Sequence, residues 1–376
     1  MANIETHLRE LGVLVGIKNE VSDLKLTSAS ISDSDFCSII DSILTSSKHS
    51  QYNNIRSVKF GLSERNIIKN AFELSKVIVN KLHIHSIISA DWFGYDSGKE
   101  EPYDIEVNGL YISLKENSFI LENMGLYKLL NCFTGSTYKT RHIFEDYAPK
   151  EYSSWFDTTW KCLLTYLSNH SNEWNYINPK NHNKRAKITK TSTAVILEYI
   201  EEKFNVSITL PINCTLNDFK IGTTSQIREG VFSKFIKDKL DSNPAYNSKK
   251  RTCAIAASNA LENELNKNLN YSSGLARFLR IHSNEYFYAK KSSNGVELYK
   301  VPAEKDFTST IQITSIVGSV PDKQANILTT IKNTRTGNTL VLRNECRFSH
   351  GQFNGTPEAK LYYEHGGSLD IIYTKL

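Results

Sequence analysis

The N-terminal stretch of the chain shows apolar residues at the spacing of amphipathic helices. Ile4, Leu8, Leu11 and Val15 follow a three- to four-residue period. After a serine-rich loop at 27–35, a second helix is predicted around Ile39–Ile43. The strongest pattern begins at Ser63, and its apolar positions are Ile67, Ile68, Ala71, Leu74, Val77, Ile78 and Leu82. This segment is therefore predicted to be a long helix with one buried face.

The period changes from helical spacing to strict alternation at 103–116. Asn108-Gly109 between two β-prone runs predicts a hairpin with a two-residue turn. In that register one face is apolar, with Ile105, Val107, Leu110, Ile112 and Leu114. The other face is polar, with Asp104, Glu106, Tyr111, Ser113 and Lys115. A slip of one residue would mix the two faces, so the pattern fixes the register.

The polar face of this hairpin brings an acid and an amine into reach of each other. Asp104 and Lys115 would be diagonal neighbours, roughly 7 Å apart between backbones, so their side chains can converge. A carboxylate is a hard oxygen ligand for a divalent cation, and an amine can hold an attacking water beside it. The solvated face of an ordinary antiparallel sheet would show the same alternation.

The hairpin also resembles a known nuclease motif. Pro102-Tyr103-Asp104 followed by Ser113-Leu114-Lys115 is similar to the PD-(D/E)XK pattern, and the next residues, 116–118, resemble those of type II restriction endonucleases. Two positions differ from the family: Tyr103 separates the proline from the aspartate, and Ser113 stands where an Asp or Glu is usual. The detailed resemblance covers 102–118, and the order of elements over about 60–135 agrees with it.

The resemblance implies an α/β (α+β) fold with a PD-(D/E)XK-like mixed sheet flanked by helices. It also implies Mg²⁺-dependent hydrolysis of phosphodiester bonds in double-stranded DNA. Asp104 and the carbonyl oxygen of Leu114 would bind the metal. Lys115 would orient or deprotonate the attacking water, and Ser113 would hydrogen-bond a metal-bound water.

A second carboxylate is needed to complete this metal site, and two residues are candidates. Glu106 projects from the same hairpin face as Asp104, one pleat nearer the turn. Glu73 lies at the edge of the apolar stripe of the preceding helix, and in this nuclease fold a helix beside the hairpin often contributes an acidic ligand. A solvated helix residue would occupy the same position as Glu73.

The rest of the chain is predicted to form two further regions. A helix capped by Ser118 is expected over 119–133 and ends at Gly135. The prediction is a nuclease core at 1–137, a mostly helical DNA-binding region at 138–300 and a β-rich region at 301–376, where alternation returns.

Two basic segments in the middle region are candidates for contacts to the DNA backbone. The run 180–190 has five basic residues and no acidic one. Such a run suits phosphate contacts, although a solvated loop looks the same. The candidates are Lys180, Lys184, Arg185, Lys187, Lys250 and Arg251.

The polar stretch 347–360 is the candidate for reading DNA bases. It contains Arg347, Gln352, Asn354 and Lys360, side chains of the kinds that recognise base edges in the major groove. An exposed turn between two strands would have a similar composition.

Composition narrows the possible functions and partners. The formal charge of the 376 residues is +5, which leans only slightly toward a polyanionic partner. The six cysteines are scattered, which argues against zinc and favours a reducing, cytoplasmic location. No membrane-spanning run and no P-loop occurs. A type II enzyme with a palindromic target would be a homodimer. The alternatives are a DNA-binding protein without cleavage and a structure-specific or repair nuclease.

Overall fold

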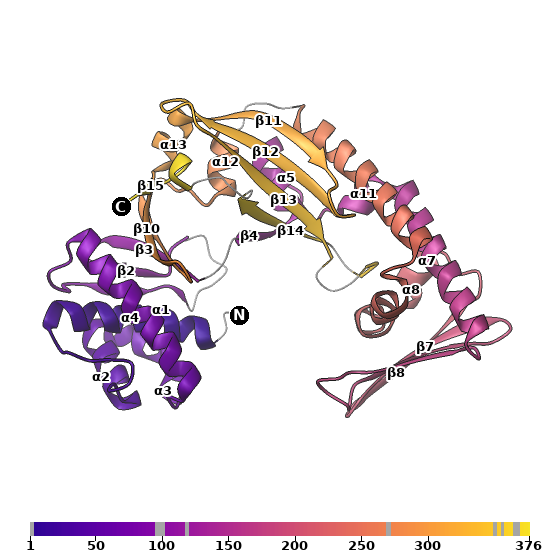
Figure 1. Ribbon diagram of the computed structural model, residues 1–376, viewed down its shortest axis with the longest axis horizontal. Helices are drawn as coiled ribbons and strands as arrows, with labels where there is room; N and C mark the ends of the chain where they lie inside the picture. Colours follow the sequence, from indigo (N-terminus) through magenta and orange to yellow (C-terminus); the bar gives the residue numbers. More distant parts are fainter. Residues whose placement is uncertain are drawn as a thin grey trace.

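The protein is an arch of three β-sheets and the helices that cover them. The computed structural model describes residues 4–94, 102–116, 120–267, 272–348, 352–354, 357–363 and 369–376. The N-terminal helices and the first sheet form one end of the arch, and the β7–β8 ribbon forms the other (Figure 1). The predicted mixed α/β class is confirmed.

The first sheet has six strands and combines residues from both ends of the chain. Its order is β1 (Ala90–Trp92), β2 (Ile105–Val107), β3 (Leu110–Glu116), β9 (Tyr286–Ser292), β10 (Gly295–Val301) and β15 (Thr374–Lys375). The β3–β9 pair is parallel and the other pairs are antiparallel. The predicted boundary at 300 therefore does not follow the sheets, because β9 and β10 complete the sheet that holds the hairpin.

Helices cover the apolar face of this sheet. They are α1 (Ile4–Ser22), α2 (Asp33–Ile43), η1 (a 3₁₀ segment, Ser46–Tyr52), α3 (Asn53–Arg56) and α4 (Leu62–Leu82). Leu14 of α1 and Leu74 of α4 share one buried core with Ile105, Ile112 and Leu114 of the hairpin. The apolar hairpin face is thus buried as the alternation predicts.

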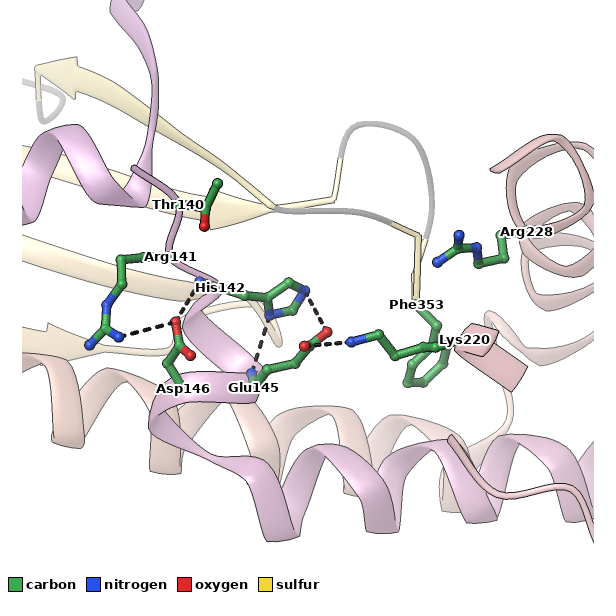
Figure 2. A pocket seen from close by; sticks show the side chains of 8 residues that line it. All are labelled: Thr140, Arg141, His142, Glu145, Asp146, Lys220, Arg228 and Phe353. Carbon is green, nitrogen blue, oxygen red and sulfur yellow. Dashed lines mark hydrogen bonds and ion pairs between the residues drawn. The ribbon is translucent and has the colours of Figure 1, made fainter. Parts of the chain in front are cut away.

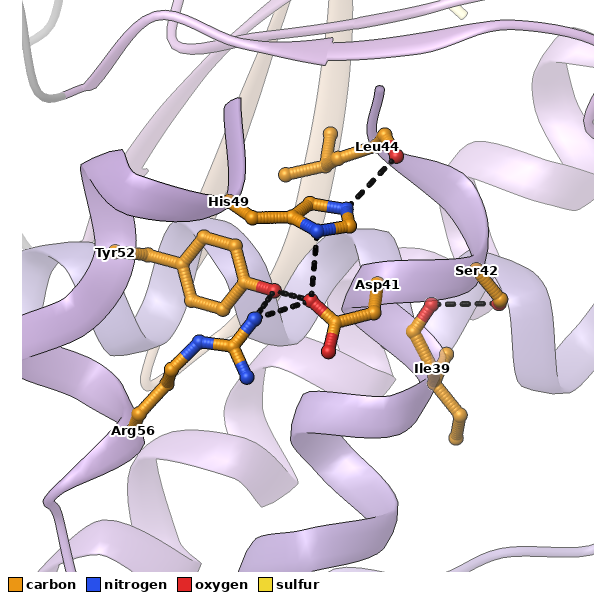
Figure 3. Close-up of polar contacts among 7 residues, drawn as sticks. All are labelled: Ile39, Asp41, Ser42, Leu44, His49, Tyr52 and Arg56. Carbon is orange, nitrogen blue, oxygen red and sulfur yellow. Dashed lines mark hydrogen bonds and ion pairs between the residues drawn. The ribbon is translucent and has the colours of Figure 1, made fainter. Parts of the chain in front are cut away.

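A polar network fixes α2 against η1 and α3 (Figure 3). The Tyr52 hydroxyl and the Arg56 guanidinium both donate hydrogen bonds to the Asp41 carboxylate, and His49 Nδ1 lies 3.5 Å from it. Burial raises the pKa of Asp41, but the hydrogen bonds from Tyr52 and Arg56 outweigh burial and leave that pKa lowered. The ionised form of Asp41 therefore holds these elements together.

The second sheet is antiparallel and forms the top of the arch (Figure 1). Its order is β11 (Ile311–Ser319), β12 (Ala325–Asn333), β13 (Thr339–Arg347), β14 (Glu358–Tyr363) and β4 (Ile120–Gly125). The helices in this part of the chain are α5 (Leu126–Thr134), α11 (Pro244–Leu265), α12 (Ser272–Phe278), α13 (Glu304–Thr310) and the 3₁₀ segment η5 (Leu369–Ile371).

The helix predicted to begin after Ser118 starts later than expected. Residues 120–125 form β4, which pairs with β14, and the helix begins only at Leu126. The edge of β14 offers backbone partners to this segment, and strand pairing of this kind overrides local helix preference.

The third sheet is a four-stranded meander in the region predicted to be mostly helical, so that prediction is wrong for this segment. Its strands are β5 (Glu173–Ile177), β6 (Arg185–Lys190), β7 (Ala194–Glu201) and β8 (Phe204–Pro211). Ala186 and Ile188 are buried in β6, and Val195 and Leu197 are buried in β7. This two-residue period is the signal of a half-buried sheet.

Aromatic residues pack the helices of this region around a shared core. The helical elements are α6 (Ile143–Tyr147), α7 (Pro149–Asn169), α8 (Leu216–Gly222), α9 (Ser225–Ile227), the π-helical η3 (Arg228–Phe232), α10 (Ser233–Phe235) and the π-helical η4 (Ile236–Leu240). Phe156 and Trp160 of α7 contact Phe232 of η3. Among the described residues, no helix has the length and apolar character needed to cross a membrane.

Candidate active site at the open end of the hairpin

The hairpin has the register that the sequence predicts. Ile105 pairs with Ile112, and Val107 pairs with Leu110. Asn108 and Gly109 have φ angles of 54° and 80°, which suit a turn that needs two left-handed residues. The Asn108 side chain accepts the backbone N–H of Ile88 at 2.8 Å and so ties the turn to the preceding loop.

Asp104 lies at the opposite, open end of this hairpin. Its backbone N–H donates to the Ile112 carbonyl at 2.9 Å, and β2 begins at the next residue. Its carboxylate accepts the Leu114 N–H at 2.6 Å and the Ser113 hydroxyl at 3.4 Å. Lys115 Nζ is 3.9 Å from the same carboxylate. The structure thus brings together the acid, the amine and the hydroxyl that the hairpin register predicts.

A buried carboxylate on α1 interacts electrostatically with this cluster. Glu10 is 3% exposed and accepts the Trp92 indole N–H at 2.9 Å. The pKa of Glu10 is raised to about 7: burial raises it most and the charge on Asp104 adds to the rise, while the hydrogen bond from Trp92 and the charges on Arg9 and Lys115 oppose it. Glu10 is therefore the helix-borne acid that interacts with Asp104.

The chain after β1 passes directly over Glu10. A Cβ added at Gly94 would lie 1.7 Å from Glu10 Oε2, so any side chain there would collide with the carboxylate. The His7 ring, one turn earlier on α1, packs edge-on against Trp92 with ring centroids 5.2 Å apart. These contacts enclose Glu10 between α1 and β1.

Neither of the two second carboxylates predicted from the sequence makes a described contact with Asp104. Glu73 lies on α4, one of the helices that cover the apolar face of the first sheet, and its carboxylate is 2.5 Å from Lys291 Nζ. Glu106 Oε1 accepts the Gly109 backbone N–H and lies 3.4 Å from the Ser89 hydroxyl, so it is directed to the turn. Glu10 is the better candidate because its charge interacts with that of Asp104, whereas Glu73 and Glu106 are held by other partners.

The sequence contained one indication of Glu10. It is the only charged residue of the segment 10–17, and the structure buries it with its apolar neighbours. A buried acid is retained only where it is paired, hydrogen-bonded or functional. Its partners could not be read from the sequence, because Trp92 and Asp104 reach it through tertiary packing.

The donor set at this site fits a magnesium ion. Among the described residues, no group of three or more His, Cys, Asp and Glu side chains could hold a metal. Mg²⁺ often takes only one or two carboxylates and completes its coordination with water and substrate phosphate. Asp104 and Glu10 would supply the carboxylates. The Leu114 carbonyl faces the same side of β3 as the Leu114 N–H that meets Asp104, since both groups of one strand residue point toward one neighbour.

The basic segment 180–190 is less free to bind DNA than its sequence suggests. Lys184 is 2.7 Å from Glu201 of β7, and Lys187 is 3.0 Å from Glu173 of β5. The meander brings in acidic partners from neighbouring strands, which a local charge pattern cannot reveal. Lys180 and Arg185 remain exposed.

The other basic candidate segment lies on α11. Burial lowers the pKa of Lys250, so this residue is poorly placed for a phosphate contact. Arg251 is exposed. Of these two residues on α11, Arg251 is therefore the better candidate for a contact to a polyanion.

The polar stretch 347–360 is only partly described, because 349–351 and 355–356 lie outside the described residues. Asn354 is 7% exposed and cannot read a base from this position, whereas Gln352 is partly exposed. Arg347 and Lys360 are partly exposed on β13 and β14. Arg343 lies on the same sheet, with its guanidinium 4.5 Å from the Tyr362 ring centroid and 3.1 Å from Glu345 Oε2.

Comparison with known proteins gives no independent identification of this site. No protein-family model matches the chain, and neither the curated proteins nor the solved structures include a significant match to it. The geometry of the residues is therefore the basis for inferring function.

Proposed function

We propose that this chain is a Mg²⁺-dependent endonuclease that cleaves double-stranded DNA at specific sequences, with a catalytic centre of the PD-(D/E)XK kind. The supporting observations are the 3.9 Å approach of Lys115 Nζ to the Asp104 carboxylate at the open end of one hairpin, and the buried acid Glu10, whose charge interacts with both. An ordinary solvated sheet face does not need a buried second carboxylate beside the first, because a buried charge is costly.

Each residue of the cluster has a role in phosphodiester hydrolysis. Asp104, Glu10 and the Leu114 carbonyl would hold the ion. When bound, Mg²⁺ supplies positive charge that polarises the scissile phosphate. Lys115 would orient the attacking water or accept its proton while the water oxygen bonds to phosphorus and the bond to the leaving oxygen breaks. Ser113, which contacts Asp104 at 3.4 Å, would keep that carboxylate oriented.

Cleavage of plasmid DNA with Mg²⁺ tests this proposal. The wild type should give discrete fragments, and Asp104→Ala, Lys115→Ala and Glu10→Gln should each lose them. Glu73→Ala is the matched control: it also removes a helix carboxylate, but one that pairs with Lys291, so cleavage should persist. Loss of cleavage in the control together with retention in Glu10→Gln would restore Glu73 as the second acid.

The same assay separates the alternative functions. DNA that is retarded but intact with the wild type would indicate a DNA-binding protein without cleavage. A smear, or cleavage only of damaged or branched DNA, would indicate a structure-specific nuclease. Either result would contradict site-specific cleavage.

The remaining parts of the proposal concern partners and location. Arg347 and Lys360 on the β13–β14 surface are proposed DNA contacts, together with Arg185 and Arg251, because cationic side chains on a surface attract the DNA backbone. A palindromic target would require a homodimer. The six cysteines are free thiols, which supports a reducing cytoplasm as the location.

A further inference from the structure

A polar pocket lies away from the hairpin, where the helices of the middle region meet residues 352–354. Its volume is about 380 Å³, within the range of small-molecule sites. It is lined by Thr140, Arg141, His142, Glu145, Asp146, Lys220, Arg228 and Phe353 (Figure 2). None of these residues takes part in the proposed cleavage.

The two carboxylates of the pocket are already paired. Glu145 is 2.5 Å from Lys220 Nζ and 3.4 Å from His142 Nε2. Asp146 accepts the backbone N–H of His142 at 2.7 Å and lies 3.7 Å from Arg141. The pocket has three cationic side chains, those of Arg141, Lys220 and Arg228, and only these two carboxylates, so its net charge is +1.

Arg228 carries this excess charge. Its guanidinium points into the pocket from the side opposite His142 (Figure 2). Its one hydrogen bond runs from Nε to the Thr224 carbonyl at 3.4 Å, and in the described part of the chain no carboxylate pairs with it. The outer nitrogens of Arg228 are thus available to an anion.

The backbone at Arg228 gives a further indication that the pocket binds a ligand. Arg228 begins a π-helical segment, and such segments occur frequently at functional sites. Arg141 is not part of this anion site, because Figure 2 shows its guanidinium directed toward Asp146 and away from Arg228.

We propose that this pocket binds the phosphate group of a phosphate ester, with Arg228 as its main ligand and Lys220 as the second cation. The planar fork of Arg228 matches phosphate oxygens in a bidentate arrangement. Glu145 opposes the phosphate, because it holds Lys220 and repels an anion. Phosphate binding therefore competes with the Glu145–Lys220 pair.

This competition gives two opposite expectations. Arg228→Gln should weaken phosphate binding at least about tenfold, because charge-assisted hydrogen bonds are lost. Glu145→Gln should strengthen it, because Lys220 is released and a negative charge is removed. Arg335→Gln is the matched control, since it removes the same charge from an exposed turn and should leave binding unchanged.

Calorimetric titration of the full chain at constant ionic strength tests the proposal. The probes are inorganic phosphate, a deoxynucleoside monophosphate and a short DNA duplex, with circular dichroism to check folding. Arg228→Lys keeps the charge without the fork, and it gives a second variant with intermediate affinity if Arg228→Gln does not fold. Monophosphate binding that Arg228→Gln weakens would identify a phosphomonoester site, and duplex binding alone that Arg228→Gln weakens would identify a DNA-backbone contact.

The proposal does not depend on the cleavage site, so Asp104→Ala should bind inorganic phosphate and the monophosphate as the wild type does. Three results would overturn it: no binding of any probe by the wild type, unchanged binding by folded Arg228→Gln, or weaker binding by Glu145→Gln.

Discussion

Glu10→Gln should make the protein more stable in the absence of metal. Glu10 is buried, and its pKa is raised from the ordinary 4.5 to about 7. One pKa unit corresponds to about 1.4 kcal/mol, so the ionised carboxylate costs the folded state roughly 3 kcal/mol at most. Glutamine keeps the size of the side chain and an acceptor for the Trp92 N–H while it removes the charge.

The expected stabilisation depends on pH in a defined direction. Between pH 4.5 and about 7 the folded wild type binds more protons than the unfolded chain, so its free energy of unfolding falls as pH rises. The variant lacks this dependence. Its advantage should grow from near zero at pH 4.5 to roughly 3 kcal/mol at about pH 8.

Urea denaturation of both proteins in a chelating buffer, repeated across this pH range, measures the effect. Added Mg²⁺ should then stabilise the wild type and narrow the gap, since a ligand that binds only the folded state raises its stability. A difference between the two proteins that is flat with pH would refute the reasoning, as would a variant that is less stable at about pH 8.

Three other substitutions test separate parts of the fold. Asn344 is fully buried, and neither polar atom of its side chain has a hydrogen-bond partner in the described part of the chain. Asn344→Leu should therefore raise the free energy of unfolding in urea by about 1 kcal/mol. A less stable variant would indicate that a buried water satisfies the amide. Gly109→Ala should destabilise by about 1 kcal/mol because φ is +80° there, as thermal unfolding would show; no change would mean that the turn relaxes. Asp41→Asn should destabilise at neutral pH, and the deficit should vanish as pH falls through the lowered pKa of Asp41; a constant deficit in pH-dependent denaturation would contradict the role given to its charge.

The sequence by itself determined the hairpin, its register and the approach of Asp104 to Lys115. Alternation and the Asn-Gly turn fixed which residues share a face, and the register then brought Asp104 and Lys115 together. These features depend on residues close in the chain, so local geometry is sufficient to predict them. The long helix α4 was predictable for the same reason, since its buried face repeats with the helical period.

Tertiary structure alone decided which elements meet the hairpin. The parallel partner of β3 is β9, far along the chain, and the segment predicted as a helix after Ser118 became β4 because β14 offered it an edge. The choice between Glu10 and Glu73 has the same origin. Both are acids on amphipathic helices. Only the packing of α1 against β1 buries Glu10 against Trp92, where its charge interacts with that of Asp104, while α4 directs Glu73 to Lys291. Periodicity shows which face of a helix is buried, but only three-dimensional packing determines which residues lie opposite that face.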